Sequence, residues 1–294
     1  MRTTYWEKNL YELIRRTSIS LPTDVENALK RARRLEAAGS SAQWAIDSML
    51  SNAQQARAEE RPLCSDTGTL IFYCRVPAGI DTNALSASIR AAVARATRDG
   101  YLRQNTVDAI SGAKYRTNVA HASPVILFQH GARKTVDVRL VMKSASSENE
   151  GRQYSLPNNE LGAGADLEGF RECILDAVLQ SQTNGGGPAI LGVCIGGDRA
   201  TGYAHSKIQF LHKLGYTTRV KALGRLENAV LRDSRKLDIG PMGLGGKSAL
   251  LDVHIGSLSR LPSSVFVSVS YMCWAFRRRG AVFGPGGGLK HWLY

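Results

Sequence analysis

The 294-residue sequence contains no long apolar run and no closely paired cysteines. No stretch approaches the roughly 18 apolar residues that a membrane helix needs. The N-terminus, from Met1 to Glu7, lacks the apolar core of a secretory signal. The five cysteines are scattered without Cys-x-x-Cys, which excludes a zinc ribbon and argues against a disulfide framework. The sequence therefore predicts a cytoplasmic globular protein with no membrane association, whose thiols can bind metal.

The net charge is +13, yet the sequence has no recognisable nucleic-acid-binding motif. Its aromatic residues do not interleave with the basic ones, as stacking on bases requires. A solvated basic surface explains the charge, and a basic field also suits an anionic small substrate or an acidic partner subunit. Nucleic acid is therefore not expected as a partner, and a basic nucleic-acid binder ranks last among the functions considered.

Hydrophobic periodicity predicts an α/β protein, with N-terminal helices packed on a mixed β-sheet core in one domain over residues 1–294. Residues 1–61 are expected to form a helical cap, residues 62–283 the core and residues 284–294 a flexible tail. The polar segment 144–166 is expected to be a long loop. Helices are expected over residues 6–14, 23–32, 42–58, 82–97, 166–182, 199–213 and 227–237, and strands over 69–76, 125–128, 136–142, 189–195, 249–255 and 265–271.

A short turn at residues 63–69 places a thiol, a carboxylate and hydroxyl groups just before an apolar strand. Cys64 in this turn and Cys273 at the end of a distant strand are the leading metal candidates, because thiolates suit iron–sulfur clusters or zinc. Each can equally be an inert buried thiol. Asp66 is the acid/base candidate, with an Asx-turn as its alternative. Arg103 can clamp a carboxylate with two bonds, or lie on the surface without a role.

The strand at 189–195 leads through two glycines into a helix, a junction that can hold an anion at the helix N-terminus. Tight packing of the helix on the strand is the alternative. The junction is not G-x-G-x-x-G and lacks a P-loop lysine, so a nucleotide-binding fold is not indicated.

Six stretches, taken in order, carry a resemblance to a known family. They resemble the alpha subunit, or N-terminal region, of the class I iron–sulfur hydro-lyases, which are the class I fumarases and the L(+)-tartrate dehydratases. The resemblance is collinear over about residues 10 to 280 and is closest to the tartrate dehydratase branch at Cys273-Trp274-Ala275. The stretches are residues 62–68, 101–105, 190–197, 237–247, 253–255 and 273–278.

The resemblance implies a [4Fe–4S] cluster held by three cysteines. An open iron of the cluster would bind a small dicarboxylic hydroxy acid and act as a Lewis acid on the departing hydroxyl. Cys64 and Cys273 match two of the ligands. The third ligand is open, with Cys194 as a candidate.

The resemblance also implies a catalytic role for Asp66 and substrate binding by Arg103, Ser65 and Thr67. The proton-abstracting base and further carboxylate clamps of the family belong to a beta-type subunit. That subunit is therefore the expected partner.

The sequence departs from the family at several site positions. The second ligand position is Gly186, and Cys194 lies eight residues further along the chain, roughly 25 Å away in a strand. At the family's Gly-Gly-Gly loop, residues 144–146 are Ser-Ala-Ser, and Leu261 stands at the position of its active-site histidine. Two functions remain open: a diverged hydro-lyase alpha subunit, or a catalytically degenerate homologue that acts as a binding or regulatory subunit.

Overall fold

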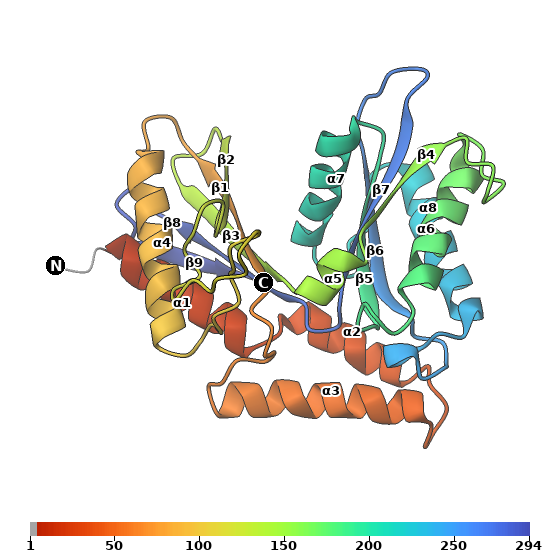
Figure 1. The fold of residues 1–294 in the computed structure, drawn as a ribbon, viewed down its shortest axis with the longest axis horizontal. Helices are drawn as coiled ribbons and strands as arrows, with labels where there is room; N and C mark the ends of the chain where they lie inside the picture. Colours follow the sequence, from red (N-terminus) through yellow and green to blue (C-terminus); the bar gives the residue numbers. More distant parts are fainter. Residues whose placement is uncertain (1–4) are drawn as a thin grey trace. The chain divides into compact units, whose positions relative to one another are not determined.

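The structure, a computed structural model, describes residues 5–294. Residues 1–4, part of the segment used to argue against a secretory signal, lie outside the described residues. The fold is mixed α/β, as predicted, with two mixed sheets (Figure 1). Two compact units form: unit 1 comprises the chain up to Thr23 with Ser51–Ala145 and Ala275–Tyr294, and unit 2 comprises Asp24–Leu50 and Ser146–Trp274.

Unit 1 is built on a five-stranded sheet in the order β2-β1-β3-β8-β9. β1 pairs parallel with β2, and the remaining neighbours are antiparallel. Two helices, α1 and α4, pack together in this unit. The elements are α1 (Tyr5–Ile19), β1 (Thr69–Val76), α4 (Thr82–Arg98), β2 (Val125–His130), β3 (Val136–Lys143), β8 (Arg277–Phe283) and β9 (Leu289–Leu293).

The core of unit 1 follows from the alternation of the two central strands. Leu70 and Phe72 of β1 and Val138 and Leu140 of β3 are buried in one apolar cluster with the inward faces of α1 and α4. Burial of each such side chain contributes about 1.5–3 kcal/mol. α4 begins where Asp81 caps it by accepting bonds from two backbone N–H groups at 2.9 and 3.0 Å.

Unit 2 is built on a four-stranded sheet in the order β4-β7-β5-β6, in which only β5 and β6 pair parallel. The helices α2, α3 and α5 contain residues of both units, α2 through Thr23 and α5 through Ala145. The remaining elements are α2 (Thr23–Arg33), α3 (Ser41–Ala58), α5 (Ala145–Asn149), β4 (Arg152–Leu156), α6 (Leu167–Ser181), β5 (Ala189–Ile195), α7 (Arg199–Ile208), α8 (Lys221–Ser234), β6 (Leu250–Ser257), β7 (Val265–Met272) and the short 3₁₀ turns Gln209–Leu211, Arg235–Leu237 and Pro241–Gly243.

Helices cover both faces of the unit 2 sheet, with α7 on one side and α6 and α8 on the other (Figure 1). Residues such as Leu191 and Val193 of β5 form an apolar core with α6 and α8. On the α7 side, a Cβ placed on Gly192 would lie 2.2 Å from the carbonyl oxygen of Ser206. Only glycine therefore allows α7 to lie this close to β5, which supports the packing interpretation of the glycine-rich junction.

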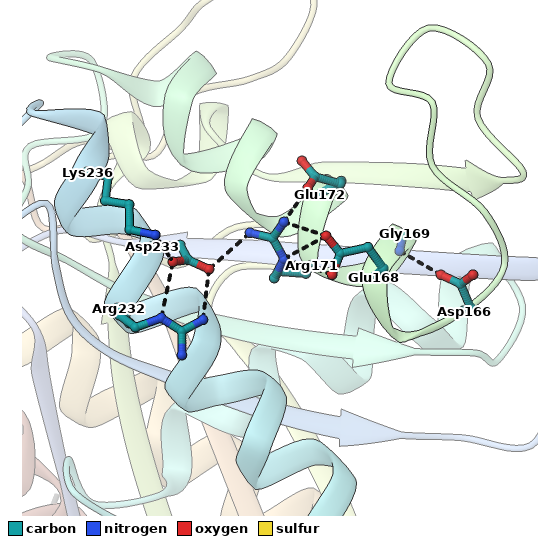
Figure 2. A network of polar contacts seen from close by, with 8 residues as sticks. All are labelled: Asp166, Glu168, Gly169, Arg171, Glu172, Arg232, Asp233 and Lys236. Atoms are coloured by element: carbon teal, nitrogen blue, oxygen red, sulfur yellow. Dashed lines mark hydrogen bonds and ion pairs between the residues drawn. The ribbon is translucent and has the colours of Figure 1, made fainter.

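An ion-pair network joins α6 to α8 (Figure 2). Arg171 of α6 lies 3.0 Å from Asp233 of α8, and Asp233 also pairs with Lys236 at 2.8 Å. Arg171 is held on its own helix by Glu168. The network fixes the spacing of the two helices that cover the core of unit 2.

Several sequence expectations are wrong at the level of elements. The segment 144–166 is not one loop, because it contains α5 and β4. The polar sequence of β4 does not indicate a strand, since β4 lies at the edge of its sheet. The segment 284–294 is not a flexible tail: β9 pairs antiparallel with β8, and Asn9 Nδ2 donates to the Gly287 carbonyl at 2.8 Å. The apolar pattern does not indicate β8, because this strand begins with three arginines. No helix within residues 5–294 is both long enough and apolar enough to cross a membrane.

Candidate functional site

The carboxylate of Asp66 is held by three N–H donors from three segments of unit 1. Its Oδ1 accepts from the Gly68 backbone N at 2.8 Å and from Asn105 Nδ2 at 2.9 Å. Its Oδ2 accepts from the Ala145 backbone N at 2.7 Å. The first bond is the Asx-turn considered from sequence, and the other two fix the carboxylate from outside its own turn. Since a carboxylate offers about four acceptor positions, about one remains for a ligand O–H.

The turn keeps its shape because of Gly68. This residue has φ +73°, and a Cβ placed on it would lie 2.3 Å from the carbonyl oxygen of Lys143. Both the backbone conformation and the close approach require glycine. The turn is therefore clamped against the end of β3, the strand that leads to Ala145.

The hydroxyl of Thr67 faces inward and supports Arg103. Thr67 Oγ1 donates to the Arg103 carbonyl at 2.9 Å, and Asn118 Nδ2 donates to the same carbonyl at 2.8 Å. The Arg103 side chain is exposed and makes no hydrogen bond or ion pair with any residue from 5 to 294. The guanidinium is thus available to an anionic ligand, while its backbone is fixed beside the Asp66 turn. Ser65 is exposed in the same turn.

Unit 1 also positions the half-buried Cys64. Both backbone polar groups of the preceding residue, Leu63, are hydrogen-bonded. The Leu63 N donates to the Ser18 carbonyl at 2.9 Å, and Asn52 Nδ2 donates to the Leu63 carbonyl at 3.1 Å. Cys64, Ser65, Asp66 and the Arg103 backbone therefore belong to one fixed set of segments.

Cys273 lies in unit 2, directly after β7, and is 6% exposed. Its backbone N donates to Ser147 Oγ at 3.0 Å, and the following Trp274 N donates to the Gly186 carbonyl at 3.1 Å. A Cβ placed on Gly186 would lie 3.4 Å from the Cys273 Cβ. Position 186 is therefore where a side chain would stand next to Cys273, and this chain has none there.

The other three thiols lie in apolar surroundings. Burial raises the pKa of Cys74 and of Cys173 to about 12, with smaller contributions from nearby carboxylates, and raises the pKa of Cys194 to about 11. Such thiols remain protonated near neutral pH and are poor metal ligands. Cys194 is fully buried near the end of β5, opposite Ser268 of β7, whereas the Cys273 end of β7 lies beside Ile190 at the start of β5.

The residues of this chain do not fit a [4Fe–4S] cluster held by three cysteines. Such a cluster needs three thiolates, and the candidates are Cys64 in unit 1 and Cys273 in unit 2. The third position is Gly186, and residues 5–294 contain no group of three His, Cys, Asp or Glu side chains able to hold a metal ion. The donor set is one thiolate short.

Two positions at which the resemblance expects other residues differ in their structural setting. At Ala145 the resemblance expects a glycine, but the contact of this residue with Asp66 is made by the backbone N, which any non-proline residue supplies. At Leu261 it expects a histidine, and Leu261 is 71% exposed in the turn between β6 and β7. The eight-residue strand β7 separates it from Cys273 by roughly 26 Å. Position 261 is thus not beside Cys273 within unit 2.

The anion site considered at the start of α7 is filled by the protein itself. Asp198 Oδ1 accepts from the Ala200 N at 2.8 Å and the Thr201 N at 3.1 Å, completing a capping box. These donors are therefore committed to the cap.

Sequence reasoning gave no role to Asn105, Asn118 or Arg277 individually. Asn118 is 1% exposed with φ +56°, and its Oδ1 accepts from the backbone N of Asn105 and of Thr106. A polar residue in a left-handed conformation is the signal that would mark such a position, but the sequence alone does not give φ.

Comparison with known proteins shows the family of the chain. Residues 7–282 match the fumarate hydratase (Fumerase) family. The chain belongs to this family. It is 40% identical over 291 residues to a Geobacillus stearothermophilus protein named "Putative fumarate hydratase class I", covering 98% of this chain and 57% of the relative.

Two further fumarase-family relatives are named as alpha subunits. The chain is 30% identical over 272 residues to a Methanocaldococcus jannaschii protein named "Putative L(+)-tartrate dehydratase subunit alpha", covering 91% of this chain and 93% of the relative. It is 27% identical over 263 residues to the L(+)-tartrate dehydratase subunit alpha of Escherichia coli K12, covering 89% and 85%. The chain thus spans little more than half of the first relative and most of the length of the alpha subunits.

Proposed function

We propose that the chain is the alpha-type half of a hydro-lyase that adds water to, or removes it from, a hydroxy dicarboxylic acid such as tartrate or malate/fumarate. A separate beta-type chain would complete the active site. The family match over residues 7–282 and the alpha-subunit names of two relatives support this function. The observation that carries it is the Asp66 carboxylate, which is fixed by three N–H donors beside the exposed guanidinium of Arg103.

Each residue of this half-site has a part in the proposed reaction. Arg103 would bind one carboxylate of the ligand with two parallel bonds. Asp66 would accept a hydrogen bond from the ligand O–H. In hydration it would take a proton from the water that adds to the double bond, and in dehydration it would return a proton to the hydroxyl, which leaves as water, with Ser65 as a further polar contact at the rim. Elimination of water also requires removal of a C–H proton, and we assign that step to the beta-type chain.

The [4Fe–4S] cluster of the family is a separate part of this proposal. Cys64 and Cys273 are the positions at which the resemblance expects two of its ligands, and residues 5–294 contain no group of three side chains that could hold it. The functional assignment of the Asp66 turn does not depend on a third ligand.

The test is hydro-lyase activity of the chain purified anaerobically with a beta-type chain, using fumarate hydration and L-tartrate dehydration. We expect Asp66→Asn to lower kcat by about 10²-fold or more, as for loss of an acid/base group. Arg103→Lys should chiefly raise KM, because a lysine cannot form the two-bond clamp. Absence of turnover in a wild-type pair that carries about four irons per alpha chain would contradict the proposal.

One observation favours a second function, a binding or regulatory subunit without turnover. Gly186 has no side chain, so position 186 supplies no second thiol next to Cys273. Iron and sulfide contents after anaerobic reconstitution, in the wild type and in Cys64→Ala, separate the two functions. Iron that is present in the wild type and lost in Cys64→Ala supports the hydro-lyase. A colourless, iron-free wild type that still binds fumarate supports the binding subunit.

A further inference from the structure

The guanidinium of Arg277 is buried beneath the Asp66 turn. Arg277 is the first residue of β8, and its side chain is 1% exposed, which places it among the largest fully buried side chains of the chain. Moving a charge out of water costs several kcal/mol unless partners compensate for it. A buried arginine at this point therefore requires an explanation.

The contacts of Arg277 compensate for its charge only in part. Nη2 donates to the Asp66 carbonyl oxygen at 2.6 Å, whereas Nε is buried and has no hydrogen-bond partner among residues 5–294. No carboxylate of residues 5–294 lies within ion-pair distance of Arg277. By contrast, Arg139 on the neighbouring β3 pairs with Asp137 at 3.0 Å.

Within the described residues, the one side-chain hydrogen bond of Arg277 goes to Asp66, the residue on which the half-site depends. The side chain of Asp66 is held by Gly68, Asn105 and Ala145, and its main chain is held by Arg277. Hydrogen bonds from a charged donor are about twice as strong as neutral ones. In the low dielectric of the interior, the positive charge also acts over a longer range than at the surface.

We propose that Arg277 is a positioning residue of this half-site: it holds the Asp66 turn through the backbone carbonyl, and its buried charge favours binding of a ligand carboxylate above that turn. This inference rests on the proposed function for its ligand, a dicarboxylate. It assigns to β8 a role that its sequence, a run of three arginines, does not suggest.

The first experiment measures fumarate and L-tartrate affinity calorimetrically on the full chain paired with a beta-type chain, for three variants. Arg277→Lys keeps a charge and a donor, Arg277→Gln keeps a donor only, and Arg277→Met keeps neither. We expect Arg277→Lys to bind within about threefold of the wild type. Arg277→Gln should bind about tenfold more weakly, a difference of about 1.4 kcal/mol, because it loses the charge of the donor. Arg277→Met should bind at least as weakly as Arg277→Gln.

Arg279→Gln is the matched control on the same strand. Arg279 donates to the Arg16 carbonyl at 3.2 Å and to Ser20 Oγ at 2.7 Å, away from Asp66. Its substitution should leave the affinity unchanged. Wild-type affinity in both Arg277→Gln and Arg277→Met would overturn the inference, as would failure of Arg277→Lys to restore binding.

A ligand-free measurement separates this inference from the proposed function. If the wild type binds neither dicarboxylate, the ligand part of the proposed function fails, and amide hydrogen exchange of residues 64–69 decides the positioning role. We expect exchange at least about tenfold faster in Arg277→Gln, recovery in Arg277→Lys and no change in Arg279→Gln. Unchanged exchange in Arg277→Gln would overturn the positioning role, even if Arg277→Met does not fold.

Discussion

The Asp66 turn of unit 1 and the Cys273 corner of unit 2 are two places where the resemblance expects site residues, and the two differ in the groups that they contain. The turn retains a carboxylate with three donors, a fixed Arg103 backbone and a glycine that nothing else can replace. The corner retains its backbone bonds through Trp274 and Ser147, but position 186 has no side chain. Polar groups that hold a turn also stabilise the fold, so their substitution would destabilise the protein. The stabilising contact of a metal ligand is with the metal, so its substitution need not destabilise the fold.

The largest effect should come from completing the corner with Gly186→Cys. The new thiol would stand beside Cys273, since a Cβ at this position lies 3.4 Å from the Cys273 Cβ. We expect iron and sulfide contents after anaerobic reconstitution to be higher in Gly186→Cys than in the wild type and to reach about four of each per chain. The φ of +68° at this position adds strain of about 1–2 kcal/mol.

Gly187→Cys is the control for this prediction, because it adds a thiol one residue further along. Its Cβ would lie 3.4 Å from the Ala249 carbonyl and not next to Cys273. Equal iron uptake in both variants would mean that position 186 is not the point at which the corner differs from the turn.

The second prediction breaks the intact turn. Gly68→Ala forces a Cβ to within 2.3 Å of the Lys143 carbonyl at φ +73°. We expect the free energy of unfolding to fall by about 3 kcal/mol or more in urea denaturation, from left-handed strain together with the clash.

Gly79→Ala separates these two causes, because Gly79 has φ +83° and no atom lies within 4 Å of the place that its Cβ would take. Gly79→Ala should lower the free energy of unfolding by about 1–2 kcal/mol, from backbone strain alone. Equal losses in the two variants would show that the contact with β3 does not clamp the turn.

The third prediction concerns a buried carboxyl group of unit 2 that lies on α8, outside the Cys273 corner. Glu227 of α8 is buried, and burial raises the pKa of its carboxyl to about 7, partly opposed by a bond from the Ile255 N at 2.8 Å. A carboxyl whose pKa is raised on folding stabilises the fold below its unfolded pKa of about 4.5. That contribution, about 3 kcal/mol, is lost as pH rises through about 7.

Glu227→Gln should therefore flatten the decline of unfolding free energy between pH 5 and pH 8, while keeping an acceptor for the Ile255 N. The exposed Glu168→Gln is the control and should leave the slope unchanged. The prediction is refuted if the free energy of unfolding declines by the same amount in the wild type and in Glu227→Gln over this pH range.

The smallest effect concerns the network of Figure 2. Arg171→Ala removes the link from α6 to Asp233 on α8, and we expect a loss of about 1 kcal/mol in urea denaturation, because these side chains remain partly solvated. Arg232→Ala, whose side chain is 66% exposed, should cost less than Arg171→Ala. The reverse order would show that the α6–α8 link does not stabilise unit 2.

The sequence predicted most helices and strands because apolar periodicity reports burial on one face. It missed β8 and β9, since three arginines and a run of glycines resemble surface chain. It predicted site roles for Asp66 and Arg103 through the family resemblance, and these roles remain predictions. It had no means of finding that Asn118 and Arg277 support them, because these contacts join segments that are distant in the chain.

The amide of Ala145 has a consequence for how divergence in this family is judged. Its bond to Asp66 comes from the main chain, so every amino acid except proline can supply it. A comparison that scores side chains counts position 145 as a lost glycine, although the donor is intact. Sequence divergence at a loop of this kind therefore overstates the loss of the site, while the loss of one side chain at position 186 is not offset by any backbone group.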